Sequence, residues 1–182
     1  QRYFDDIRES LPEVDAILGV GQYKEICEAI EGVVRDGGYF SCGEDLALDY
    51  LNESRIPFTP KGSAYLKIAE GCDNRCSYCA IPNIRGPFRS RPPEDILQEA
   101  NRLVAAGVKE LVVVAQDTTR YGLDLYGEPY LSYLLTELNK IPDLRWIRLL
   151  YLYPDEVTKS LIDTMRDCEK VLPYVDLPLQ HI

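Results

Sequence analysis

Strand-like and helix-like segments alternate over residues 61–182, and this alternation restricts the fold more than any other feature of the sequence. Apolar runs predict strands at residues 64–70, 111–115, 146–151 and 174–177. Apolar stripes at helical spacing predict helices from Ser90 to Gly107, over 130–140, and after Asp155, with Ser90 and Asp155 as candidate caps. Because short loops join these segments, we expect an α/β fold with a parallel sheet and right-handed crossovers.

The first 60 residues form a less regular pattern. A helical stripe ends at Pro12, residues 14–20 predict a buried strand, and 22–32 predict a helix with Ile26 and Ile30 on one face. We assign residues 1–35 to the C-terminal remnant of an α/β domain, 36–60 to a linker, and 61–182 to the main domain. Since the chain begins at Gln1 and not at a methionine, we expect a piece of a longer protein.

Charge is distributed unevenly along the chain. Its net charge is −10, of which residues 1–60 contribute −8. An acidic surface disfavours nucleic acid and suits a basic partner, although it also serves solubility alone. No apolar run is long enough for a membrane span and no secretory signal opens the chain. Six cysteines without such a signal indicate a reducing compartment, so we expect a cytoplasmic protein that does not bind membranes.

Three of the cysteines, Cys72, Cys76 and Cys79, have a C-x3-C-x2-C spacing directly after the first predicted strand. A structural zinc site needs four ligands, and the chain's one histidine, His181, is remote in sequence. Thiolates are the usual ligands of iron–sulfur clusters. A four-iron cluster held by three cysteines leaves one iron open for an exogenous ligand. At this point a zinc-stabilised binding module, an iron–sulfur electron-transfer module and an enzyme are all possible.

Polar residues follow the other predicted strands. Gln116 and Asp117 come after the second, Tyr151 after the third, and Gln180 with His181 after the fourth. In parallel α/β sheets, functional residues gather at the carboxyl ends of the strands, where the three cysteines also lie. The remaining cysteines, Cys27, Cys42 and Cys168, are scattered, and we expect each to pack as a small apolar residue.

The cysteine spacing, with Tyr78 just before the last cysteine, resembles that of the radical S-adenosylmethionine (SAM) superfamily. This resemblance implies a partial (β/α) barrel, truncated here, and a four-iron (4Fe-4S) cluster whose open iron binds SAM. By position, Cys72, Cys76 and Cys79 would ligate the cluster, Tyr78 would flank the adenine of SAM, and Gln116 and Asp117 would meet its amino group. Tyr151, Gln180 and His181 are candidates for contact with ribose or substrate.

Longer segments resemble the methylthiotransferases of this superfamily, and specifically the RimO type. They are YLKIAEGCDNRCSYCAIPNIRGPFRSR, AQDTTRYG, WIRLLYLYP and YVDLPLQHI. The resemblance implies methylthiolation of the β-carbon of an aspartate in a small-subunit ribosomal protein, a basic partner. It also implies an electron donor such as a flavodoxin-like or ferredoxin-like protein. The alternative within this chemistry is a tRNA (adenosine) methylthiotransferase, and an iron–sulfur electron-transfer module is the alternative outside it.

The chain departs from this family in two respects. The N-terminal methylthiotransferase domain normally supplies three further cysteines for a second 4Fe-4S cluster. We expect these ligands upstream of Gln1, because Cys27 and Cys42 do not match their positions. The last barrel strands and the C-terminal RNA-binding-type domain are also missing from this sequence. The piece alone should therefore not complete the reaction.

Overall fold

The computed structural model describes residues 3–43, 48 and 62–179. The chain divides into two compact units, Gln1–Glu53 and Ser54–Ile182. Gln180 and His181, two of the predicted site residues, lie outside the described residues. So does most of the predicted linker.

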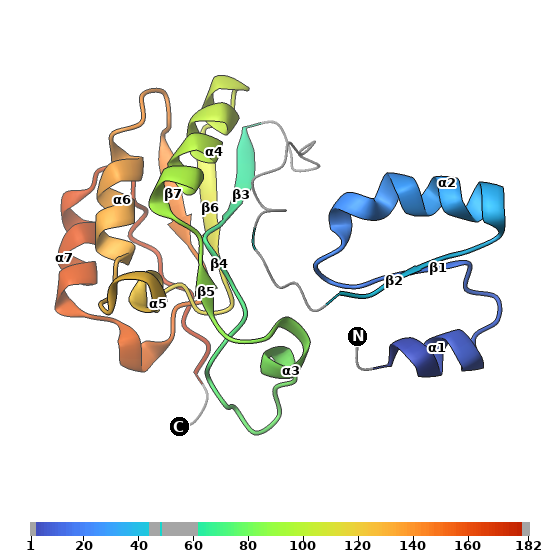
Figure 1. Ribbon diagram of the computed structural model, residues 1–182. Coiled ribbons are helices and arrows are strands. Elements are labelled where there is room, and N and C mark those ends of the chain that lie inside the picture. The colour runs from blue at the N-terminus through green and yellow to red at the C-terminus, as the bar shows by residue number, and fades with distance from the viewer. Residues whose placement is uncertain (1–2, 44–47, 49–61, 180–182) are drawn as a thin grey trace. The chain divides into compact units, whose positions relative to one another are not determined.

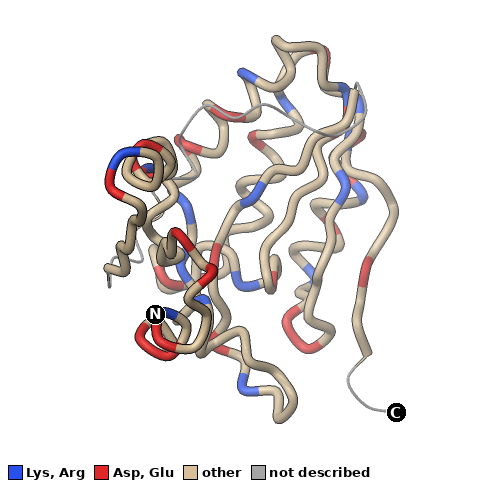
Figure 2. Tube along the Cα trace, turned by 90° about the vertical axis from the view of Figure 1, so that its right-hand side faces the viewer, with Lys and Arg blue, Asp and Glu red and all other residues tan. Residues whose placement is uncertain are grey.

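The first unit contains a two-stranded parallel sheet, with one helix before the first strand and another between the two strands (Figure 1). Its elements are α1 (Phe4–Ser10), β1 (Ala16–Leu18), a 3-10 turn η1 (Tyr23–Glu25), α2 (Ile26–Asp36) and β2 (Tyr39–Ser41). Strand β1 pairs with β2, with Ala16 opposite Tyr39. Strand β2 therefore lies inside the stretch that the sequence analysis assigned to a linker. Acidic residues are spread along both helices (Figure 2).

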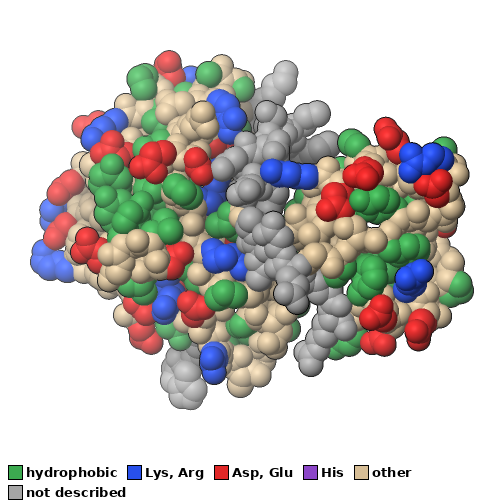
Figure 3. All heavy atoms as spheres, in the orientation of Figure 1, with side chains coloured by type: hydrophobic (Ala, Val, Ile, Leu, Met, Phe, Trp, Pro, Cys, Tyr) green, Lys and Arg blue, Asp and Glu red, His purple; other side chains and the backbone are tan. Residues whose placement is uncertain are grey.

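Helix α2 extends beyond its predicted end at residue 32 because Gly32 is not a stop. Gly32 is buried, and a β-carbon there would lie 2.9 Å from Cδ2 of Tyr39, so the glycine permits close packing on β2. Strand β1 is only partly buried. Ile26 and Ile30 share a face as predicted, yet both are exposed. Hydrophobic side chains, in green, are visible on the surface of this unit (Figure 3). Cys27 is exposed too, so the prediction that it packs as an apolar residue is wrong, because α2 packs through Ala29 and Gly32.

The second unit is built on a three-stranded parallel sheet in the order β3-β6-β7, which confirms the predicted α/β architecture (Figure 1). The strands are β3 (Ser63–Lys67), β6 (Glu110–Val114) and β7 (Trp146–Leu149). Helices α4 (Pro93–Ala105) and α6 (Leu131–Asn139) pack on them, α7 (Lys159–Asp167) packs on α6, and α5 (Leu123–Tyr126) is short. Apolar side chains of the strands and helices form one core, including Leu66, Ile96, Val113, Leu134, Ile147 and the predicted buried Cys168. The sheet thereby carries the loops that follow β3, β6 and β7 at one edge.

Two predicted strands differ from the structure. The first splits at Ile68, whose N–H still bonds Val114 while its carbonyl accepts from Arg91. The chain then forms β4 (Ala69–Glu70), which pairs antiparallel with β5 (Arg89–Ser90). The predicted strand at 174–177 is wrong over the described residues. The isolated bridge to β7, between Ile147 and Val171, lies before that segment, and Pro173 lacks the N–H that would continue a ladder from it.

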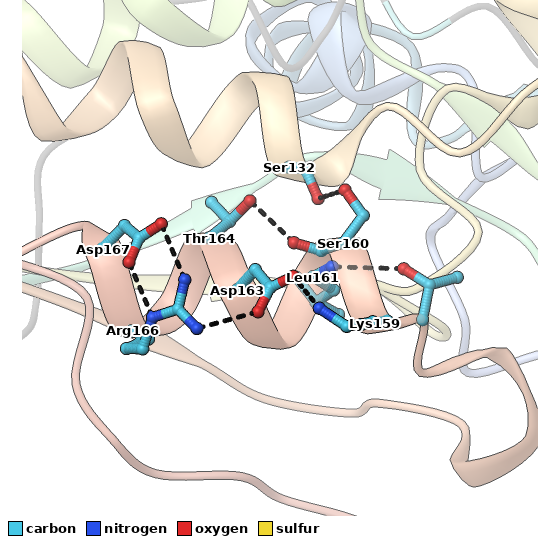
Figure 4. Close-up of polar contacts among 9 residues, drawn as sticks. Ser132, Lys159, Ser160, Leu161, Asp163, Thr164, Arg166 and Asp167 are labelled. Atoms are coloured by element: carbon cyan, nitrogen blue, oxygen red, sulfur yellow. Dashed lines mark hydrogen bonds and ion pairs between the residues drawn. The ribbon is translucent and has the colours of Figure 1, made fainter.

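Helix starts in the second unit also differ from the predicted caps. Ser90 belongs to β5, and α4 begins after Pro92. Asp155 lies in a 3-10 turn, η3 (Pro154–Glu156), and Thr158 caps α7 by accepting from the N–H of Leu161. Figure 4 shows the exposed face of α7, where Lys159, Asp163, Arg166 and Asp167 form a row of ion pairs. Among the described residues, no helix is both long and apolar enough to cross a bilayer.

Candidate functional site

The cysteine loop, residues 71–79, follows β4 at the carboxyl edge of the sheet and is fixed at its start by Gly71. Gly71 has φ +80°, and a β-carbon there would lie 2.1 Å from the carbonyl oxygen of Pro87. The N–H of Cys72 donates to Gly86 (3.2 Å), and Oδ1 of Asp73 accepts from the N–H of Phe88 (3.0 Å). The loop is therefore bound along its first residues to the segment after α3 (Ile81–Arg85).

Replacing Gly71 by alanine should destabilise the loop and reduce iron loading. The left-handed backbone costs a non-glycine residue about 1–2 kcal/mol, and the clash with a backbone carbonyl adds to this. Gly127→Ala is the matched control, because Gly127 has a similar φ of +75° and no atom within 4 Å of the added carbon. Thermal unfolding and iron content of the full-length protein measure the effect. Equal iron content in both variants would contradict the positioning role of Gly71.

The three predicted cysteines line one pocket of about 780 Å³. Its other lining residues are Asp73, Arg75, Ser77, Pro82, Asn83 and Pro87. Within the described part of the chain, no three His, Cys, Asp or Glu side chains gather closely enough to hold one metal ion. Three thiols in one pocket suit an iron–sulfur cluster, since thiolates are its usual ligands and each of its irons takes a different one.

The charge balance of the pocket also favours a cationic centre. Cys72 is 8% exposed, and burial raises the pKa of its thiol. A backbone hydrogen bond involving Asn74 lowers that pKa, while the negative charges of Asp117, Cys79 and Cys76 raise it further. Three thiolates beside a carboxylate are thus unfavourable by themselves. Bound iron would offset their repulsion, because a metal ion is the largest local charge in such a site.

Asp117 connects the cysteine loop to the loop after β6. It is buried, and its Oδ2 accepts from Nδ2 of Asn74 (2.9 Å). Its Oδ1 accepts from the N–H of Thr119 (3.1 Å) and from the Thr119 hydroxyl. Both carboxylate oxygens therefore have protein partners, and Asp117 holds the two loops in register.

Gln116 has a different partner, Glu70, which the sequence analysis missed. Glu70 is 1% exposed, and its Oε1 accepts from Nε2 of Gln116 (2.9 Å). Its other oxygen contacts Lys67 and lies 3.8 Å from Nη1 of Arg85. The only available signal was a carboxylate at the end of an apolar strand, directly before the cysteine loop. Oε1 of Gln116 is buried and has no hydrogen-bond partner among the described residues.

The sequence model described as "Radical SAM superfamily" matches residues 66–182. The chain belongs to the radical SAM superfamily. It is 49% identical over its whole length to the "Ribosomal protein uS12 methylthiotransferase RimO" of Alkaliphilus oremlandii, and 49% identical to that of Thermoanaerobacter sp.. It spans only 40% and 42% of those two relatives.

Solved structures support the same superfamily fold. The radical SAM methyltransferase TsrM from Kitasatospora setae, a structure with cobalamin and a 4Fe-4S cluster bound, aligns with a TM-score of 0.54. The alignment covers 71% of this chain and 26% of TsrM, at 18% sequence identity. At that identity the likeness concerns the fold alone. It agrees with the prediction of a truncated barrel of the radical SAM type.

Two tyrosines of this radical SAM core belong to loops of the site, Tyr78 to the cysteine loop and Tyr153 to the loop after β7. Tyr78 is 78% exposed, so its ring is not packed into the core. Tyr153 was not singled out from the sequence. Burial raises the pKa of its phenol, and the charges of Asp155, Cys76, Asp117 and Tyr78 raise it further. Of the scattered cysteines, Cys42 lies in the first unit and is partly exposed.

Proposed function

We propose that the full-length protein is a radical SAM methylthiotransferase that modifies the β-carbon of an aspartate in ribosomal protein uS12. The observation that carries this proposal is the 49% identity, over the whole chain, to proteins named uS12 methylthiotransferase. The cysteine pocket at the carboxyl edge of the sheet supports it, because this is where a parallel sheet presents its functional loops. The net reaction replaces a C–H bond by C–S–CH3.

In this proposal Cys72, Cys76 and Cys79 hold a 4Fe-4S cluster with one open iron, where SAM binds. When bound, the cluster and SAM supply the one-electron chemistry that removes hydrogen from an unactivated carbon. A second 4Fe-4S cluster takes its ligands from outside this chain.

The remaining site residues bind and orient SAM. Gln116 receives its amino group, and the support for this is the buried Oε1 that lacks a protein donor. Asp117 holds the cysteine loop in place through its hydrogen bond with Asn74. Its negative charge also attracts the positively charged amino group of SAM. Tyr78 covers the adenine, and its exposed ring leaves it able to do so.

The partner in this proposal is a basic ribosomal protein in the cytoplasm, with a flavodoxin-like or ferredoxin-like electron donor. The chain's net charge of −10 supports a basic protein over tRNA, since polyanions are repelled by an acidic surface.

Incubation of the anaerobically purified full-length protein with SAM and a reductant tests the proposal. Ribosomal protein uS12 and tRNA are offered separately, and mass spectrometry detects the methylthio adduct. We expect the adduct on the ribosomal protein. An adduct on tRNA only would contradict the substrate. A paramagnetic resonance signal that does not change when SAM is added would instead indicate an iron–sulfur electron-transfer module. Stoichiometric zinc without iron would indicate a zinc-stabilised binding module.

A further inference from the structure

Tyr151 has an unusual backbone for a bulky residue. Among the described residues, Asp143 (φ 63°) and Tyr151 (φ 58°) are the non-glycine residues with positive φ. Aspartate visits this region readily, whereas a bulky aromatic residue there is a genuine outlier that costs about 1–2 kcal/mol. Such strain persists only where the surroundings impose it.

Hydrogen bonds from two other segments hold Tyr151 in this conformation. Its N–H donates to Oδ2 of Asp176 (3.0 Å). Its carbonyl accepts from the N–H of Thr118 (3.0 Å) and from the Thr118 hydroxyl (3.2 Å). The next residue, Leu152, is fully buried and donates to the carbonyl of Asp176 (3.0 Å). The backbone is therefore fixed on both sides of the strained residue.

The tyrosine side chain itself contributes little to the fold. It is 50% exposed, and its hydroxyl makes no hydrogen bond within the described part of the chain. Glycine would make the same backbone bonds without strain, because they involve only the N–H and carbonyl groups. Folding alone therefore gives no reason for a tyrosine here.

The position of Tyr151 links it to the site. Its carbonyl binds Thr118, which directly follows Asp117, and Asp117 binds Asn74 of the cysteine loop. Tyr151 thus lies at the same edge of the sheet as the cysteine pocket. The fixed backbone sets the direction of its Cα–Cβ bond, and a tyrosine, with only two side-chain torsions, loses little entropy when it makes a contact.

We propose that Tyr151 is a substrate-contact residue whose hydroxyl donates a hydrogen bond to an oxygen of the polypeptide substrate. This rests on the proposed function, because it takes a ribosomal protein as the substrate. The strained backbone sets the direction in which the side chain leaves the main chain. The protein keeps a strained tyrosine here because the side chain contributes to substrate binding.

Two variants of the full-length protein test this proposal. Tyr151→Gly should relieve the strain and raise the midpoint of thermal unfolding by about 2 °C or more. It should also raise the KM for the ribosomal protein at least about tenfold, because it removes the contact area of the ring as well as the hydrogen bond. Tyr151→Phe should raise KM by several-fold while leaving the unfolding midpoint unchanged. In both variants the SAM-dependent change of the paramagnetic resonance signal should persist.

Asp143→Gly is the matched control, because it relieves positive φ between α6 and β7, at the opposite end of that strand. It should leave KM unchanged. An unchanged KM in Tyr151→Gly, or a fall in its unfolding midpoint, would overturn the proposal while the proposed function stands. Failure of the wild-type protein to modify the ribosomal protein would overturn both.

Discussion

Replacing Cys76 by alanine should abolish iron–sulfur cluster assembly and SAM cleavage while leaving the second unit folded. Cys76 lies in the cysteine loop, is partly exposed, and is outside the hydrophobic core. Its loss leaves two thiolates in the pocket, too few to hold a four-iron cluster. The core around Leu66, Val113 and Ile147 does not depend on it.

Iron and sulfide content, SAM cleavage products and the far-ultraviolet circular dichroism spectrum measure this prediction in the full-length protein. Cys27→Ala is the matched control, because Cys27 is exposed and belongs to the first unit. The control should retain iron and SAM cleavage at the wild-type level. Normal SAM cleavage by Cys76→Ala would show that the ligand assignment is wrong. An unfolded variant would show that the loop supports the fold itself.

Replacing Glu99 by alanine should destabilise the second unit by about 3–5 kcal/mol, the usual cost of removing one partner from a buried ion pair. Glu99 is 7% exposed and Arg91 is 1% exposed, and they contact through Oε2 and Nη1 at 2.7 Å. The Arg91 guanidinium also donates to the carbonyl of Lys67 (2.6 Å), and the Arg91 carbonyl accepts from the Tyr121 hydroxyl (2.9 Å). The variant leaves a buried charge without its carboxylate.

The midpoint of thermal unfolding checks this prediction, with an expected fall on the order of 10 °C. Two further variants separate the causes. Arg91→Leu combined with Glu99→Leu should recover much of the loss, since an apolar pair carries no desolvation penalty. Lys159→Ala removes the exposed pair between Lys159 and Asp163, and should cost less than about 1 kcal/mol. If the unfolding midpoint of Glu99→Ala were as close to that of the wild type as the midpoint of Lys159→Ala is, the buried pair would not be important for stability.

The site was predictable where its residues lie close together in sequence. The C-x3-C-x2-C spacing placed three thiols in one loop, and the structure gives them a common pocket. The residues after β6 could be selected because parallel strands present their carboxyl ends at one edge. Glu70 and Tyr153 were missed, because a single carboxylate or phenol has no periodic signature.

By itself, the sequence determined the parallel α/β order of the second unit and the position of the cysteine loop. Both follow from patterns that repeat or cluster within a few residues, such as the apolar run of β6. Only the tertiary structure decided that Asn74 meets Asp117, that Gln116 meets Glu70, and that Tyr151 is strained. The physical reason is that these features depend on hydrogen bonds between segments far apart in the chain, and local spacing carries no information about such bonds.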